Sequence, residues 1–167
     1  MRRVYSAEYA GYRKNMKIST AYISARDTSV GNPAAIVHYG VELNTRQKKI
    51  LECLPEYDSR HTVKKSEVSM VDLDALTAFT GDEFGLFTKG GQRFIIRGNN
   101  RTVNVTEEYA RQLYNEGYKF SGHTHNTVGD LLASDGDYLI LRAFKMKRSV
   151  IYDPAGHFST FEIDGDD

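Results

Sequence analysis

Two histidines separated by one residue, His123 and His125, are the side chains whose types and spacing most directly suggest chemistry in this sequence. In an extended segment, residues i and i+2 project to the same side, so both imidazoles can point at one cation. Asp137 follows His125 in the next predicted helix and offers a carboxylate as a third ligand. Two histidines and a carboxylate leave an open position for water on a zinc ion. The spacing therefore predicts a zinc site, although two polar residues in a metal-free turn would produce the same pattern.

Hydrolysis at such a site needs a group that moves a proton and a donor for the negative charge that develops. Zinc lowers the pKa of its bound water to near neutrality, which makes a nucleophile without a serine or a cysteine. Glu83 begins a β-rich run directly after a predicted helix and is our candidate for taking and returning the proton. Ser134 lies three residues before Asp137 and is our candidate oxyanion donor. Ser134 is also a candidate helix N-cap, and the two roles are compatible.

The order of these residues along the chain resembles that of the JAMM (JAB/MPN-like) metallohydrolases. The shared pattern is a Glu-Xxx-Gly-Leu strand after a helix, an HxH pair, a later SxxD and a strand ending in Asp-Pro, and it covers residues 68 to 154. The resemblance implies a zinc-dependent metalloprotease or isopeptidase that cleaves an amide, peptide or isopeptide bond in a peptide or protein substrate, such as one carrying a ubiquitin-like tail. It assigns the zinc ligands to His123, His125 and Asp137, the general acid/base to Glu83 and the oxyanion donor to Ser134.

The sequence departs from the family pattern at two places. Asn126 stands where the family usually has a proline after the second histidine, and the eight residues between His125 and Ser134 are one more than the usual gap. Gly129 can absorb an extra residue in a turn. Asp130 and Asp135 are alternative ligands if the register differs.

Helical periodicity, capping residues and turn residues predict the elements that position this chemistry. The fold class is α/β (mixed α+β), and the resemblance implies a JAMM/cytidine-deaminase-like sheet flanked by helices. A hairpin turns at Lys-Gly-Gly and another turn lies at Asp-Pro-Ala-Gly. The predicted elements are a helix at about 44–54 capped by Asn44, a strand at 62–70, a helix capped by Asp72, the hairpin at 83–99, a helix capped by Thr106, a strand at 118–125, a short helix over Ser134 and Asp137, and strands at 139–144 and 148–163.

The chain length suits one domain with a further segment. We expect an N-terminal extension at residues 1–60, which contains the helix at 44–54 and a strand-like stretch at 17–24. The JAMM-like metallohydrolase domain is expected at 61–163, and residues 164–167 form an acidic tail.

Composition excludes several classes of protein. The 22 basic and 22 acidic side chains cancel, so charge alone predicts no nucleic-acid partner. No apolar run reaches the ~18 residues of a membrane span and no signal peptide is recognisable, so we expect no membrane association and a cytoplasmic location.

Segments such as QRFIIRGN resemble segments of JAMM-like proteins of phage heads and prophages, which would mean a bacterial host cytoplasm or a virion. The single cysteine, Cys53, excludes an internal disulfide and is expected to be buried.

Two alternatives stay open. A phage, virion or scaffold component can retain the JAMM fold for interaction without catalysis, although an intact Glu83 argues against a purely structural remnant. His125 and His157 also begin HxT/S-like motifs that resemble those of metal-free 2H phosphoesterases. Zinc deaminases do not fit, because the chain has neither HxE nor PCxxC. Oligomeric state leaves no signal in the sequence.

Overall fold

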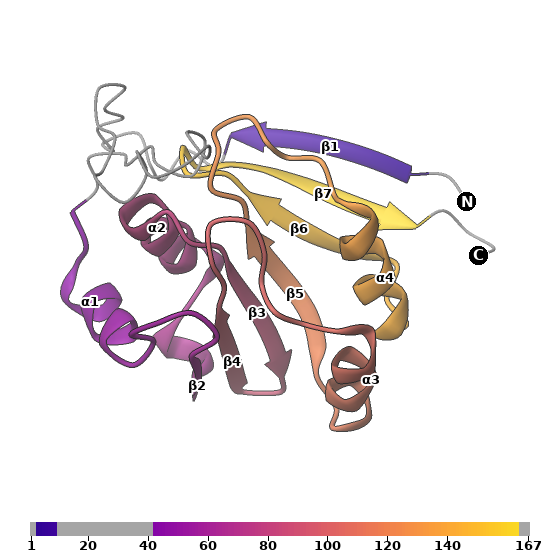
Figure 1. Cartoon of the computed structure of the whole chain (residues 1–167), viewed down its shortest axis with the longest axis horizontal. Coiled ribbons are helices and arrows are strands. Elements are labelled where there is room, and N and C mark those ends of the chain that lie inside the picture. The colour runs from indigo at the N-terminus through magenta and orange to yellow at the C-terminus, as the bar shows by residue number, and fades with distance from the viewer. Residues whose placement is uncertain (1–2, 10–41, 164–167) are drawn as a thin grey trace.

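The computed structural model describes the backbone of residues 3–9 and, with side chains, residues 42–163. Within these residues seven strands form one mixed sheet, which confirms the predicted α/β class (Figure 1). Neighbouring strands are antiparallel, except that β5 and β6 are parallel. In sheet order, the strands are β1 (Arg3–Tyr9), β7 (His157–Ile163), β6 (Arg148–Tyr152), β5 (Lys119–Thr124), β3 (Phe84–Lys89), β4 (Gln92–Arg97) and β2 (Arg60–Lys64).

Helices cover both faces of the sheet, as Figure 1 shows. Alternating residues of β3 show the two sides, because Phe84 and Leu86 join one apolar core while Phe87 joins the other. The core that contains Phe84 and Leu86 lies under α1 (Thr45–Glu52) and α2 (Met70–Thr80), and the core that contains Phe87 lies under α3 (Glu107–Asn115) and α4 (Asp135–Ala143).

None of the helices in the described part of the chain combines the length and apolar character that a membrane crossing requires.

Capping chemistry explains where the helices begin. Asn44 and Thr106 accept backbone hydrogen bonds at the starts of α1 and α3, as predicted. The predicted cap of α2 was wrong. Ser69 is its N-cap, and Asp72 lies in the first turn, where its carboxylate accepts the Ser69 N–H at 2.9 Å and pairs with Arg46 at 2.7 Å.

The strand predicted at 139–144 was also wrong, because residues 139–143 lie within helix α4 and Phe144 is its C-cap. The Ser134–Asp137 capping box starts the helix, and Tyr138 and Leu141, three residues apart, share its buried face. Leu139 lies outside the core instead and is 49% exposed. The strand predicted at 62–70 is shorter than expected, because β2 ends at Lys64 before a 3₁₀ turn.

Segments on both sides of residue 60 contribute to the same sheet and core. Strand β1 pairs with β7, while Ile50 and Leu54 from the α1 region pack into the core under α2. Cys53, predicted to be buried, is exposed, because it caps the end of α1 and the next residue, Leu54, occupies the core position. The stretch at 17–24 and the tail at 164–167 lie outside the described residues.

A β-bulge in β5 sets the direction of the first histidine. Phe120 pairs with Phe87 and Gly122 pairs with Leu86, so Ser121 is the extra residue. The Ser121 Oγ and Thr88 Oγ1 are 2.7 Å apart and hydrogen-bonded. Because of the bulge, Phe120 and His123 face the same side of the sheet although they are three residues apart, and their rings stack at 5.5 Å.

Gly122 lets α2 approach β5 closely. A Cβ atom at Gly122 would lie 2.8 Å from Val150 Cγ2 and 3.0 Å from Met70 Sδ. We expect Gly122→Ala to lower the free energy of unfolding by about 1 to 3 kcal/mol, because the new methyl group overpacks this contact. Urea unfolding measures the change. The control is Gly91→Ala, since a Cβ there meets nothing within 4 Å; equal losses in both variants would contradict the prediction.

Candidate metal centre

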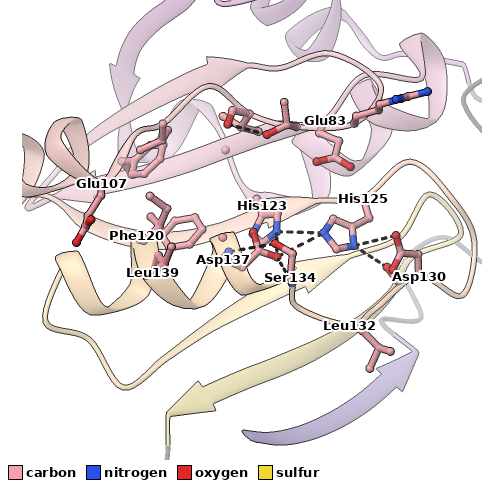
Figure 2. A pocket seen from close by; sticks show the side chains of 18 residues that line it. Glu83, Glu107, Phe120, His123, His125, Asp130, Leu132, Ser134, Asp137 and Leu139 are labelled. Atoms are coloured by element: carbon pink, nitrogen blue, oxygen red, sulfur yellow. Dashed lines mark hydrogen bonds and ion pairs between the residues drawn. The ribbon is translucent and has the colours of Figure 1, made fainter. Parts of the chain in front are cut away.

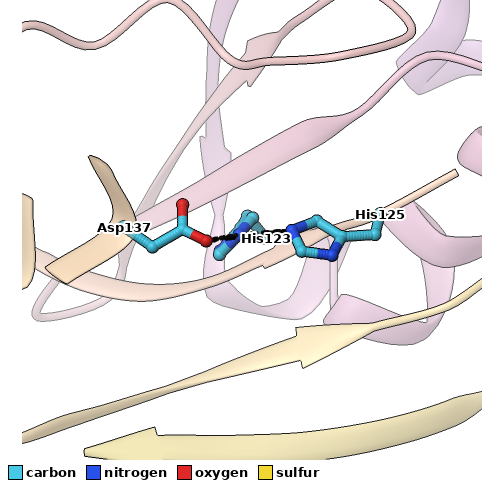
Figure 3. A group of neighbouring side chains, drawn as sticks. All are labelled: His123, His125 and Asp137. Atoms are coloured by element: carbon cyan, nitrogen blue, oxygen red, sulfur yellow. Dashed lines mark hydrogen bonds and ion pairs between the residues drawn. The ribbon is translucent and has the colours of Figure 1, made fainter. Parts of the chain in front are cut away.

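The C-terminal end of β5 and the start of α4 bring two imidazoles and a carboxylate together (Figure 3). The Nε2 atoms of His123 and His125 are 3.2 Å apart. Oδ2 of Asp137 lies 3.3 Å from His123 Nε2 and 3.8 Å from His125 Nε2. The structure therefore places the three predicted ligands around one point.

The spacing of these three atoms suits one small cation. A circle through points separated by 3.2, 3.3 and 3.8 Å has a radius of about 2.0 Å, and zinc bonds to histidine nitrogen and carboxylate oxygen are ~2.0 to 2.2 Å long. An ion slightly above the plane of the three atoms would satisfy all three bonds and keep one side open. The donor set of two imidazoles and one carboxylate is also one that zinc accepts in hydrolytic sites.

Neighbouring groups hold both imidazole rings. The Nδ1 atom of His125 lies 2.9 Å from the backbone oxygen of Asp130, so a proton on Nδ1 donates to that oxygen, and in the neutral imidazole the Nε2 lone pair faces the site. The His123 ring stacks on Phe120 at an interplanar angle of 24°. His123 Nδ1 is buried and has no hydrogen-bond partner among the residues that the structure describes. Asp130, one of the two alternative ligands, thus orients the candidate ligand His125 through its backbone oxygen. Asp135, the other alternative, does not line the pocket at this site.

Helix capping fixes the carboxylate. The Ser134 N–H donates to Asp137 Oδ2 at 2.9 Å, and the Asp137 N–H donates to Ser134 Oγ at 3.1 Å. The oxygen that faces the histidines is therefore anchored by the backbone of the helix start, where the helix dipole also favours a negative charge. Since Ser134 Oγ accepts in this box, its hydroxyl proton is available to donate into the pocket that it lines.

Asn126, which stands where the JAMM pattern has a proline, has its own structural role. Asn126 is buried, and its Nδ2 donates to the backbone oxygens of Gly81, at 2.9 Å, and Asn100. These bonds tie the end of β5 to the end of α2 and to the segment after β4. A proline side chain has no donor for either bond, so the departure at Asn126 comes with a different means of holding the loop.

Asp153 is a structural residue that the sequence analysis did not identify. Its buried carboxylate accepts backbone hydrogen bonds from Gly129 and Ala155 at 2.9 Å and from His157 at 3.0 Å, and it pairs with the His157 ring at 2.9 Å. Gly129 has a φ of +88°, the left-handed conformation expected where the loop absorbs an extra residue. The Asp-Pro-Ala-Gly turn was visible in the sequence, but no local pattern linked its carboxylate to the loop after His125.

Glu83 lies across the pocket from the histidines, with its carboxylate directed toward them (Figure 2). Its backbone is fixed on both sides, because its N–H donates to Asn99 O at 2.8 Å and its carbonyl accepts from Gly98 N at 2.7 Å. The residue is only 7% exposed. Burial raises the pKa of Glu83 to about 8; the charge of His125 opposes this shift and that of Asp137 adds to it.

The charged groups around the histidines influence one another strongly. Burial lowers the pKa of His125, but its hydrogen bond to Asp130 and the charge of Glu83 outweigh this and raise that pKa to about 9. Burial would raise the pKa of Asp137, yet the neighbouring His123 keeps it well below its usual range. The carboxylates of Asp130 and Asp137 and the carboxyl group of Glu83 surround the histidine pair, which favours a cation in their midst.

The two histidines and the carboxyl groups of Glu83, Asp130 and Asp137 line one end of a pocket of about 420 Å³. The pocket lies between α4 with the segment before it and the segment at 101–107 that follows β4. It is therefore large enough for part of a substrate as well as an ion.

No family model matches this chain, and no curated protein and no solved structure matches it either. The resemblance to the JAMM metallohydrolases accordingly stays a prediction from the sequence.

Protons are expected to compete with zinc for His125. With a pKa of about 9, this imidazole carries a proton at neutral pH in the metal-free protein, and zinc must displace that proton to reach Nε2. Below pH 9 the apparent zinc affinity should fall by about tenfold for each unit of pH, one proton being released per ion bound. Competition with a chromophoric chelator between pH 6 and pH 8 measures the slope.

A matched variant tests the cause of this slope. Asp130→Asn removes the negative partner that contributes most to raising the pKa of His125. Its zinc affinity should depend less steeply on pH over the same range. Zinc affinity that does not change with pH in the unmodified protein would contradict the prediction.

Proposed function

We propose that this protein is a zinc-dependent hydrolase that cleaves an amide, peptide or isopeptide bond with a metal-activated water. The observation that carries the proposal is the placement of three ligand atoms, His123 Nε2, His125 Nε2 and Asp137 Oδ2, at separations that suit one zinc ion. A buried carboxylate, Glu83, faces them across the pocket.

Each side chain of the site has its own role in the proposed reaction. His123, His125 and Asp137 would hold a zinc ion, which would supply a Lewis acid and lower the pKa of a bound water. Glu83 takes the proton of the attacking water and returns it to the leaving amine. A burial-raised pKa suits this task, because such a carboxyl group gains and loses a proton near neutral pH. The Ser134 hydroxyl donates a hydrogen bond to the oxyanion that develops on the carbonyl.

The geometry gives less support to the alternatives. The pocket is lined by His125 but not by His157, which pairs with Asp153 instead, so the two histidines that a 2H phosphoesterase needs do not share it. A non-catalytic scaffold does not need a buried carboxyl group that points at the histidines. Burial also disfavours the ionised form of Glu83, which is a cost that a purely structural role leaves unexplained.

Metal analysis of the purified protein, followed by peptide cleavage assays, tests the proposal. We expect one zinc ion per chain by elemental analysis, and hydrolysis of peptides that stops on chelation and resumes when zinc is restored. Mass spectrometry of a peptide mixture identifies the bonds cleaved. Metal-free protein that fails to bind added zinc would overturn the proposal, and bound zinc without hydrolysis of peptides or isopeptides would favour the scaffold.

A further inference from the structure

The pocket continues from the metal centre into an apolar recess. Its floor is a row of stacked rings, in which Phe120 lies 5.5 Å from the His123 ring and Phe87 lies 5.5 Å from Phe120. Both phenylalanines are buried in the core beneath α3 and α4. The row leads away from the candidate ligand His123 along the pocket.

Aliphatic side chains form the two walls of the recess. Val103 and Val105 line it on the side of the segment after β4, and Leu139 and Ile140 line it from α4. Val103, Val105 and Ile140 are only partly buried, and Leu139 is half exposed, so these apolar surfaces still face the pocket. Apolar surface that borders a pocket in this way gains free energy when a ligand covers it.

A glycine keeps the recess open beside the metal centre. Gly85 is the second residue of β3 and lies directly opposite His123 in the strand register. A Cβ atom there would lie 3.2 Å from Phe87 Cε2 and 3.4 Å from Val103 Cγ1, so a side chain would fill the space between floor and wall. Glycine within a buried strand is typical of a place where a ligand comes close.

We infer that this recess holds a bulky apolar side chain of the substrate residue whose carbonyl is attacked, and that Gly85 and Val103 determine this specificity. The inference rests on the proposed zinc-dependent hydrolysis, because the metal centre places that carbonyl at the mouth of the recess. A carboxylate side chain would lose water against Phe87 and Phe120, and Glu107, which also lines the pocket, carries the same charge. The substrate class is therefore a peptide or amide with a residue such as leucine or phenylalanine at the cleaved carbonyl.

Hydroxamates of N-acetyl amino acids test the recess without requiring turnover. The hydroxamate group binds zinc, while the amino-acid side chain probes the recess, and calorimetry on the zinc-loaded protein measures each dissociation constant. We expect the leucine and phenylalanine compounds to bind about tenfold to a hundredfold more tightly than the glycine compound, as burial of one large apolar side chain implies. The aspartate compound should gain nothing over glycine.

Two variants that narrow the recess and one matched control complete the test. Val103→Phe and Gly85→Ala should remove most of the preference for leucine while retaining zinc and binding of the glycine hydroxamate. The control Val128→Phe adds the same bulk at an exposed position that does not line the pocket, so the preference should persist.

The outcomes separate the two claims. Zinc-loaded protein that binds all the hydroxamates equally, or a leucine preference that survives in both narrowed variants, overturns the recess and leaves the hydrolase proposal in place. Protein that binds no zinc overturns both.

Discussion

Replacing Glu83 by glutamine is expected to leave zinc bound and to lower kcat by about a hundredfold to ten-thousandfold, the range that general acid/base catalysis supplies. Glutamine keeps the shape of the side chain but cannot take a proton from water. Glu83 lies across the pocket from the three ligand atoms and is not one of them, so the zinc content should not change. Steady-state kinetics on the best peptide found, together with metal analysis of the same sample, measure both effects.

The matched control is Glu108→Gln, which makes the same chemical change at an exposed position outside the pocket. Its kcat should stay within about twofold of the unmodified enzyme, as expected for a surface substitution away from the site. Loss of zinc in Glu83→Gln would show that this carboxylate is a ligand and not the base. Unchanged kcat with zinc in place would remove Glu83 from the mechanism.

The same variant has an expected effect on stability. Burial raises the pKa of Glu83 to about 8, so the folded metal-free protein holds a proton that the unfolded chain releases near pH 4 to 5. This group therefore costs the metal-free protein stability as the pH rises from about 4 to 8. Metal-free Glu83→Gln should lose less stability over that pH range than the unmodified protein, which urea unfolding at several pH values measures.

Local sequence patterns predicted the parts of the fold that depend on local physics. Asn44 and Thr106 cap helices because their side chains reach the backbone of the next turn. The Lys-Gly-Gly turn forms the β3–β4 hairpin, and Gly90 has the positive φ that such a turn needs. The alternation that points His123 and His125 to one side is likewise a property of extended backbone, so the pair was visible before the structure was known.

Other features depend on contacts between distant segments, which local patterns do not encode. The apolar run at 139–144 fits a strand or a helix equally well by its local pattern, whereas its helix α4 packs Tyr138 against Phe161 of the distant strand β7. The bulge at Ser121 follows from pairing with β3. The hydrogen bonds of Asn126 to Gly81 and Asn100 join segments far apart in the chain. The apolar recess also lacked a sequence signal, because its walls come from separate segments.

Replacing His123 by alanine is expected to weaken zinc binding by about a hundredfold to a thousandfold, a share of the binding free energy of zinc sites in proteins. The variant keeps only His125 and Asp137, whose ligand atoms are 3.8 Å apart. Hydrolysis should fall with the zinc content. Competition with a chelator measures the affinity, and His61→Ala, which removes a histidine outside the pocket, should bind zinc as the unmodified protein does.

Loss of the buried imidazole also leaves a space beside Phe120, so the variant should be less stable even without metal. The effect of zinc on unfolding separates this packing loss from the loss of a ligand. At a zinc concentration about one hundred times its dissociation constant, the unmodified protein should gain about 2.7 kcal/mol in unfolding free energy, whereas His123→Ala should gain about 0.4 kcal/mol or less at the same concentration. If zinc stabilises both proteins equally, the ion binds elsewhere and the paired histidines do not form its site.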